Sequence, residues 1–157
     1  MNHFYKVLSL FLLILLTSCF GSYKNEKIIG PYSIIALDIP TDMCIIHNEK
    51  EDYSGGSVVV SNTVFEVEWN NNFIVAKQHP NSYVLKSLLK NQPKELIDSY
   101  LTKNKNEITF YYLIDVKANS LFPTLFFTPQ QLELAKKELN VGNFQNKIYY
   151  ENLDQRD

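Results

Sequence analysis

The fold is decided by residues 64–77, which read Val64-Phe65-Glu66-Val67-Glu68-Trp69-Asn70-Asn71-Asn72-Phe73-Ile74-Val75-Ala76-Lys77. Apolar and polar side chains alternate up to Trp69, a pattern typical of a strand with one buried face. Three asparagines follow, a residue type that tolerates positive φ, and apolar residues resume at Phe73. These features predict a β-hairpin.

The register of this hairpin depends on its turn. A two-residue loop at residues 70–71 predicts that Val67 faces Ile74. The expected core face then carries five side chains, those of Phe65, Val67, Trp69, Ile74 and Ala76. The expected opposite face carries Glu66, Glu68, Val75 and Lys77, with Glu66 diagonal to Lys77 across the two strands.

Helices and a further strand are expected after the hairpin. Apolar residues at helical spacing predict two short helices, over residues 82–90 and 93–102. Residues 108–116 are apolar on both faces, which is typical of a central strand, and their expected partner is the strand 73–77. The run Thr128-Pro129-Gln130-Gln131 has the form of a capping box with Pro at the first helical position, so a helix is expected to about Leu139.

Strands are also expected before the hairpin, at residues 32–37 and 43–47. Residues 19–29 are polar and lack periodicity, which indicates a tether. Residues 30–142 are expected to form a single globular domain, and residues 143–157 a polar tail. The expected fold is α+β: an antiparallel sheet of about five to six strands with two to three helices packed on one face, preceded by a signal-peptide helix.

The N-terminal segment resembles a bacterial lipoprotein signal. Residues 7–16 are apolar except for Ser9, and this run is shorter than the roughly 20 residues of a spanning helix. The following Leu16-Thr17-Ser18-Cys19 has the form of a lipobox. The resemblance implies that residues 1–18 are removed and that Cys19 carries a diacylglycerol, often with a third acyl chain on its amine. The alternative is an ordinary secretory signal that ends near a coincidental cysteine.

Two or more acyl chains hold a protein stably on a bilayer. The expected location is therefore the bacterial cell envelope, with the exported chain lipid-anchored to the outer membrane or the cell surface. The expected partners are the membrane, through the lipid on Cys19, and an unidentified envelope protein.

Composition bears on several function classes. The chain has 15 basic and 17 acidic residues, so no basic excess favours nucleic-acid binding. With Cys19 lipidated, Cys44 has no partner for an intrachain disulfide, and we expect it to be a buried small hydrophobe. Cys44 and His47 fall on opposite faces of a strand, which argues against a nucleophilic pair. Zinc spacings, phosphate loops and dinucleotide fingerprints are absent from the sequence, so we expect no metal and no cofactor.

Four residues are candidates for a functional surface. Glu66 and Glu68 share a strand face about 6.6 Å apart, at about 3.3 Å per residue, and paired carboxylates can act as acid and base in glycoside cleavage. Alternating glutamates are more often the solvated face of a strand. Lys77 and His79 lie at a strand exit, where functional residues gather. The alternative for these two is that they end the strand and cap the next helix.

Several segments in order resemble one family. They are the lipobox, a Gly-Pro-Tyr strand start, Asp-Met-Cys-Ile-Ile, the hairpin end Phe-Ile-Val-Ala-Lys-Gln-His-Pro, and Tyr-Tyr-Leu-Ile-Asp-Val. Together they are similar to small bacterial lipoproteins that carry the domain of unknown function numbered 3997, over roughly residues 32–139. The resemblance implies export and one compact domain, and it assigns no reaction.

Two functions of different classes follow from these observations. The first is a non-enzymatic lipoprotein that binds a protein or another envelope component through an aromatic sheet edge or loop. The second is a small envelope hydrolase that uses Glu66 with Glu68, or Lys77 with His79.

Overall fold

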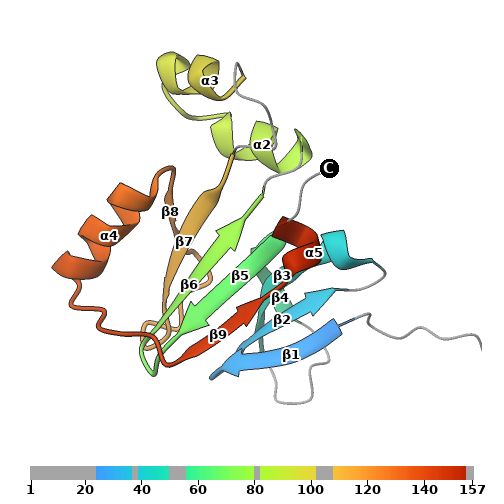
Figure 1. Cartoon of the computed structure of the whole chain (residues 1–157), viewed down its shortest axis with the longest axis vertical. Coiled ribbons are helices and arrows are strands. Elements are labelled where there is room, and N and C mark those ends of the chain that lie inside the picture. The colour runs from blue at the N-terminus through green and yellow to red at the C-terminus, as the bar shows by residue number, and fades with distance from the viewer. Residues whose placement is uncertain (1–23, 37–38, 50–55, 80–81, 102–107, 155–157) are drawn as a thin grey trace, which may run out of the picture.

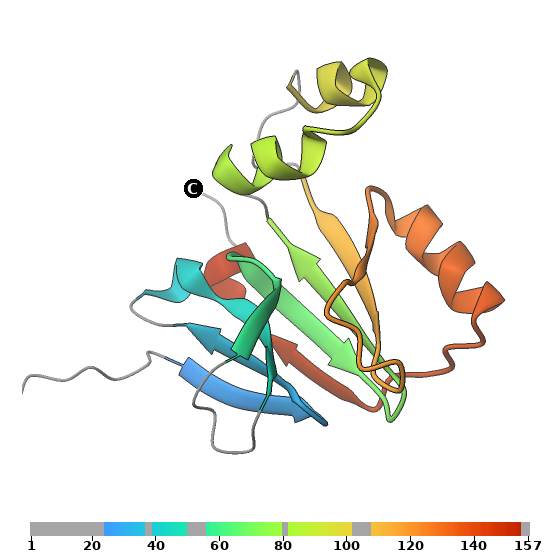
Figure 2. The same cartoon turned by 180° about the vertical axis from the view of Figure 1, so that it is seen from behind.

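The computed structural model describes residues 24–36, 39–49, 56–79, 82–101 and 108–154. In this part of the chain, a four-stranded and a five-stranded antiparallel sheet lie one behind the other (Figures 1 and 2). The first sheet contains, in spatial order, β1 (Lys24–Ile29), β2 (Tyr32–Ala36), β3 (Cys44–Asn48) and β4 (Gly56–Val60). The second contains β8 (Thr124–Phe126), β7 (Phe110–Asp115), β6 (Phe73–Gln78), β5 (Val64–Trp69) and β9 (Asn146–Tyr149). The helices are η1 (Pro40–Asp42), α2 (Ser82–Leu89), α3 (Lys94–Leu101), α4 (Pro129–Glu138) and α5 (Glu151–Asp154).

The predicted α+β class is confirmed, but the predicted single sheet is wrong. The chain leaves the first sheet after β4 and enters the second at β5. Between them Thr63 has φ 70°, in the left-handed region, and its amide donates to the Thr41 carbonyl at 3.1 Å. This turn separates two runs of strands that the sequence pattern presents as one series.

The main core lies between the two sheets. Side chains of the first sheet, such as Ile34 and Ile45, share one buried cluster with Val67 and Ile74 of the second. At one end of the sandwich, Leu85 and Leu89 of α2 and Tyr100 of α3 belong to the same cluster. The two helices stand beyond the ends of β6 and β7 rather than on a sheet face (Figure 1).

A smaller core lies on the outer face of the second sheet. Val75 of β6 and Leu113 of β7 are covered there by Leu132 of α4 and by Val141. Helix α4 therefore covers the β7 side of this face. The prediction of helices packed together on one face is corrected accordingly, because only α4 takes that position among the longer helices described.

The hairpin of β5 and β6 has a longer turn than predicted. Val67 faces Ala76 instead of Ile74, and Trp69 faces Ile74. The cause is Asn70, whose side-chain oxygen accepts from the amides of Asn72 and Phe73, each at 2.9 Å. An Asx-type turn of this kind keeps four residues between the last paired positions.

A β-bulge in β5 changes the outward-facing residues. The register shifts between Val64 and Glu66, which leaves Phe65 as the extra residue. Val64 is fully buried in the core, whereas Phe65 lies on the outer face with Glu66 and not on the predicted core face. The longer turn, and not the bulge, places Glu66 directly opposite Lys77, where the sequence predicted a diagonal contact.

Part of the predicted tether is a strand. Residues 24–29 form β1, which pairs with β2 from Lys24 opposite Ala36 to Ile29 opposite Tyr32. It is an edge strand whose first four residues are at most half-buried, and Ile28 alone is buried in the core. Its polar composition follows from that edge position.

The predicted polar tail also belongs to the domain. β9 pairs with β5, with Ile148 opposite Val67, and α5 follows it. Ile148, Tyr150 and Leu153 pack against the main core. The globular domain therefore runs past residue 142.

Other predicted elements are confirmed. The two short helices are α2 and α3, and β7 pairs with β6 along its whole length. The capping box at α4 is present, with Thr128 Oγ1 accepting from the Gln131 amide at 3.2 Å and the Gln131 side chain accepting from the Thr128 amide. The predicted signal peptide, Cys19 and the first part of the tether lie outside the described residues. Among the described residues, every helix is too short or too polar to cross a bilayer.

Candidate functional site

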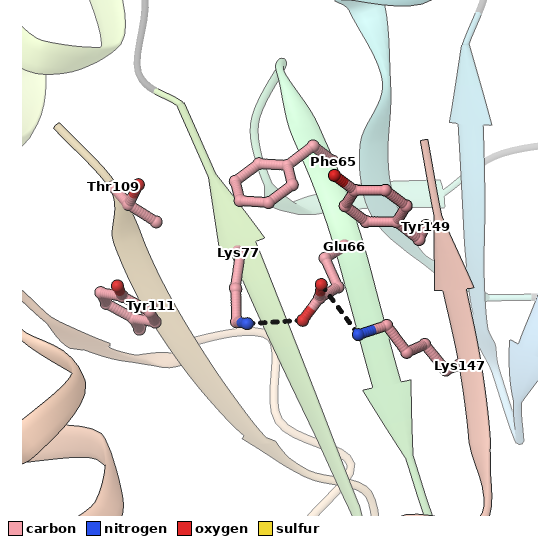
Figure 3. Close-up of a pocket in the computed structure, with 7 residues that line it drawn as sticks. All are labelled: Phe65, Glu66, Lys77, Thr109, Tyr111, Lys147 and Tyr149. Atoms are coloured by element: carbon pink, nitrogen blue, oxygen red, sulfur yellow. Dashed lines mark ion pairs between the residues drawn. The ribbon is translucent and has the colours of Figure 1, made fainter. Parts of the chain in front are cut away.

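The β5 and β9 side of the second sheet's outer face holds an open hollow of about 420 Å³. Its lining comes from four neighbouring strands and the segment just before β7: Phe65, Glu66, Lys77, Thr109, Tyr111, Lys147 and Tyr149 (Figure 3). We call it the outer groove. It combines charged groups along its floor with aromatic side chains on either side.

Glu66 is the centre of the outer groove. Its side chain is 8% exposed, and its two oxygens contact two different ammonium groups. Oε1 lies 2.6 Å from Lys77 Nζ, and Oε2 lies 2.9 Å from Lys147 Nζ (Figure 3). Burial by itself raises the pKa of the Glu66 carboxyl, but the hydrogen bonds and charges of the two lysines outweigh it, so the pKa is lowered. Glu66 is therefore a carboxylate at neutral pH.

Lys147 links the two glutamates. Its ammonium also lies 3.3 Å from Glu68 Oε1, so Glu66 and Glu68 share one cation. The hydrogen bond to Glu66 is the main cause that raises the pKa of Lys147. The sequence does not single out Lys147, because residues 143–157 have the composition of a polar tail. The alternation in Asn146-Lys147-Ile148-Tyr149 was the available signal for a strand, but it does not indicate which strand would be its partner.

An aromatic stack closes one end of the groove. The rings of Phe65 and His79 are stacked, with centroids 4.0 Å apart and planes at 14°. His79 Nδ1 lies 3.2 Å from the Ile108 carbonyl oxygen and 3.3 Å from Thr109 Oγ1. Tyr149 contacts Phe65 edge-on, with centroids 6.4 Å apart. The bulge at Phe65 makes this stack possible because it turns the ring to the outer face.

The four residues that the sequence singles out lie on one surface but make different contacts. Glu66 and Lys77 form an ion pair, Glu68 joins them through Lys147, and His79 belongs to the stack. Gln78, between Lys77 and His79 in the chain, points the other way and is fully buried. Its side-chain amide nitrogen, Nε2, donates to the carbonyl oxygens of Ser61 and Asn62, each at 2.8 Å.

Cys44 and His47 lie away from the groove, on β3 of the first sheet. The prediction that Cys44 is buried is confirmed, since it is 7% exposed, and burial raises the pKa of its thiol to about 11. His47 Nε2 lies 2.7 Å from Asn119 Oδ1. Neither residue forms part of a nucleophilic pair here.

The groove offers binding groups more readily than proton-transfer groups. A lowered pKa keeps the Glu66 carboxyl ionised at neutral pH, which disfavours its use as a general acid. Lys147 lies between Glu66 and Glu68, and this keeps both carboxylates paired. Across the described residues, His, Cys, Asp and Glu side chains do not gather in a group of three that could hold a metal ion.

Comparison with protein-family models identifies the family of this chain. The family model described as 'Protein of unknown function (DUF3997)' matches residues 29–152, which is most of the chain. The chain belongs to the DUF3997 family. The match includes β9 and the start of α5, so the family domain reaches into the segment predicted to be a tail. Searches of curated proteins and of solved structures found no match.

Proposed function

We propose that this DUF3997 protein is a lipid-anchored lipoprotein of the bacterial cell envelope that binds an envelope component in the outer groove, without catalysis. The observation that carries the proposal is the Glu66 cluster: a buried carboxylate that holds two partly exposed lysines at the floor of an open hollow. Burying such a group is costly unless it is fully paired. An ordered set of charges between aromatic rings is typical of a recognition site.

The anchor rests on the lipobox at residues 16–19. Four residues separate Cys19 from Lys24, the first residue of β1. At no more than about 3.8 Å per residue, this segment reaches less than about 20 Å. A lipid on Cys19 would therefore keep the start of β1 close to the bilayer.

The alternative of an envelope hydrolase has less support. Glu66 and Glu68 are both engaged by Lys147, which opposes the use of one as an acid and the other as a base. Lys77 is paired with Glu66, and His79 is stacked on Phe65. A binding role accounts for all of these contacts.

Mass spectrometry of the mature protein tests the anchor. We expect the first residue to be Cys19 with diacylglycerol on its thiol. A Cys19→Ser variant should lack the lipid and leave the membrane fraction. An unmodified Cys19, or a chain that still begins at Met1, would contradict the anchor.

Site-specific photo-crosslinking in living cells tests the binding site. A photoreactive amino acid in place of Tyr111 lies in the outer groove, whereas one in place of Leu134, 60% exposed on α4, serves as the control. We expect adducts that form at position 111, are absent at position 134, and weaken in a Lys77→Gln background. Equal adducts at both positions, or none at position 111, would contradict a ligand in the groove.

A further inference from the structure

We infer that the outer groove recognises a carboxylate with an apolar group beside it, as in the C-terminal residue of a peptide. This inference rests on the proposed binding function and names the ligand class for the same site. The carboxylate would lie on the solvent side of Glu66 and bridge Lys77 and Lys147.

The two lysines have donors left over. An ammonium group has three N–H donors. Within the described part of the chain, Lys77 Nζ forms an ion pair with Glu66, and Lys147 Nζ forms ion pairs with Glu66 and Glu68. Two donors of Lys77 and one of Lys147 thus remain for a ligand, on side chains that are 32% and 48% exposed. The groove therefore favours a ligand with hydrogen-bond acceptors.

Glu66 sets the spacing of the two ammonium groups. Each of its oxygens holds one of them, at 2.6 and 2.9 Å, so both lie at the ends of a single carboxylate. Figure 3 shows Lys77 and Lys147 on opposite sides of Glu66 along the groove floor. A second carboxylate on the open side would accept from the same two ammonium groups, and such charge-assisted hydrogen bonds are stronger than neutral ones.

The charge balance disfavours a dianion. Lys77 and Lys147 carry two positive charges, and Glu66 and Glu68, both paired with Lys147, carry two negative charges, so the four groups sum to zero. A carboxylate adds one negative charge to this neutral cluster, whereas a phosphate dianion adds two and is repelled more strongly.

The aromatic rings give the ligand its second feature. Tyr111 of β7 and Tyr149 of β9 flank the row of charges (Figure 3). Tyr149 is 46% exposed, and its ring centroid is 5.8 Å from Lys147 Nζ. An apolar side chain next to the carboxylate would pack against such a ring. The C-terminal residue of a peptide combines both groups.

Calorimetric titration of the full chain in detergent micelles tests this ligand class. The probes are N-acetyl-leucine and N-acetyl-leucinamide, which differ in charge and hardly in shape. We expect the acid to bind at least about tenfold more tightly than the amide, because the amide removes the charge-assisted bonds. Inorganic phosphate should bind more weakly than the acid.

Variants separate recognition from a purely structural role. Lys77→Gln should weaken binding of the acid by about tenfold, and Lys77→Arg should largely restore it. Lys136→Gln is the matched control, since Lys136 pairs with Glu133 on α4 and does not line the groove. Thermal unfolding of each variant reports whether it folds.

Three outcomes would overturn the inference: no binding of the acid, equal binding of acid and amide, or tighter binding of phosphate. The comparison of Lys77→Gln with Lys77→Arg separates a loss of the charge from a loss of the fold. If the acid fails while crosslinks at position 111 persist, the ligand class is wrong and the binding function stands. If the crosslinks are also absent, both are wrong.

Discussion

Glu66 shows how one side chain can organise a surface. The longer hairpin turn brings Glu66 directly opposite Lys77, and the pairing of β9 with β5 brings Lys147 to its other oxygen. Two cations lower the pKa of the carboxyl despite its burial. The sign of this shift fixes the pH dependence. A lowered pKa adds stability above the unfolded-state value of about 4.3, and that stability is lost as pH falls through the folded-state pKa.

We therefore predict that Glu66→Gln lowers the free energy of unfolding by about 1–2 kcal/mol at pH 7, less than for a fully buried pair because both lysines are partly exposed. The difference from the parent protein should shrink below about pH 4 and vanish once Glu66 is protonated. Urea unfolding at a series of pH values measures it. Glu133→Gln is the control, because that side chain is 57% exposed and its pair with Lys136 should contribute less than about 0.5 kcal/mol. A difference in unfolding free energy that does not change with pH would contradict a stabilising role for the Glu66 charge.

At the scale of elements, β9 completes both the sheet and the outer groove. It pairs with four residues of β5, from Glu66 to Trp69, and supplies Lys147 and Tyr149. Its Ile148, and then Tyr150 and Leu153 just after it, cover part of the main core. The strand is thus a structural element whose outward side chains form one wall of the site.

Removing residues 145–157 should destabilise the domain by at least about 3 kcal/mol, because it exposes apolar surface and leaves the edge of β5 that faces β9 unpaired. The urea midpoint of the full chain and of the truncated chain measures this loss. A truncation that removes residues 155–157 alone is the control and should keep the parent midpoint. Equal urea midpoints for the two truncated chains would show that β9 does not contribute to the stability of the domain.

At the scale of the molecule, the two sheets share one core and should unfold together. Ile34 and Ile45 of the first sheet lie in the same buried cluster as Val67 and Ile74 of the second. Separate unfolding would expose the inner face of whichever sheet remained. A domain of this size with one core is expected to show a single transition.

Two probes test this cooperativity, one in each sheet. Trp69, the single tryptophan, reports on β5 through its fluorescence, and the buried thiol of Cys44 reports on β3 through its labelling. In a Cys19→Ser background Cys44 is the single thiol, and we predict that both probes give the same urea midpoint. Two separated midpoints would mean that each sheet is its own folding unit.

Local patterns were sufficient for much of this fold. The hairpin of β5 and β6, the central strand β7, helices α2 and α3, and the capping box of α4 all depend on residues close in sequence, and all are confirmed. The lipobox is likewise a local pattern, and its role stays a prediction. Glu66, Glu68 and Lys77 were candidates because alternation in a strand already places them on a polar face.

Tertiary structure alone decided how these parts meet. β1 and β9 are edge strands with polar residues, and only their partners β2 and β5 make them strands. The partition into two sheets depends on the turn at Thr63, which no periodicity reveals. Lys147 is 81 residues from Glu66 in the chain, and long-range pairing alone brings the two together. Sequence therefore determined the elements whose signals are local, whereas the outer groove exists only because distant strands share one sheet.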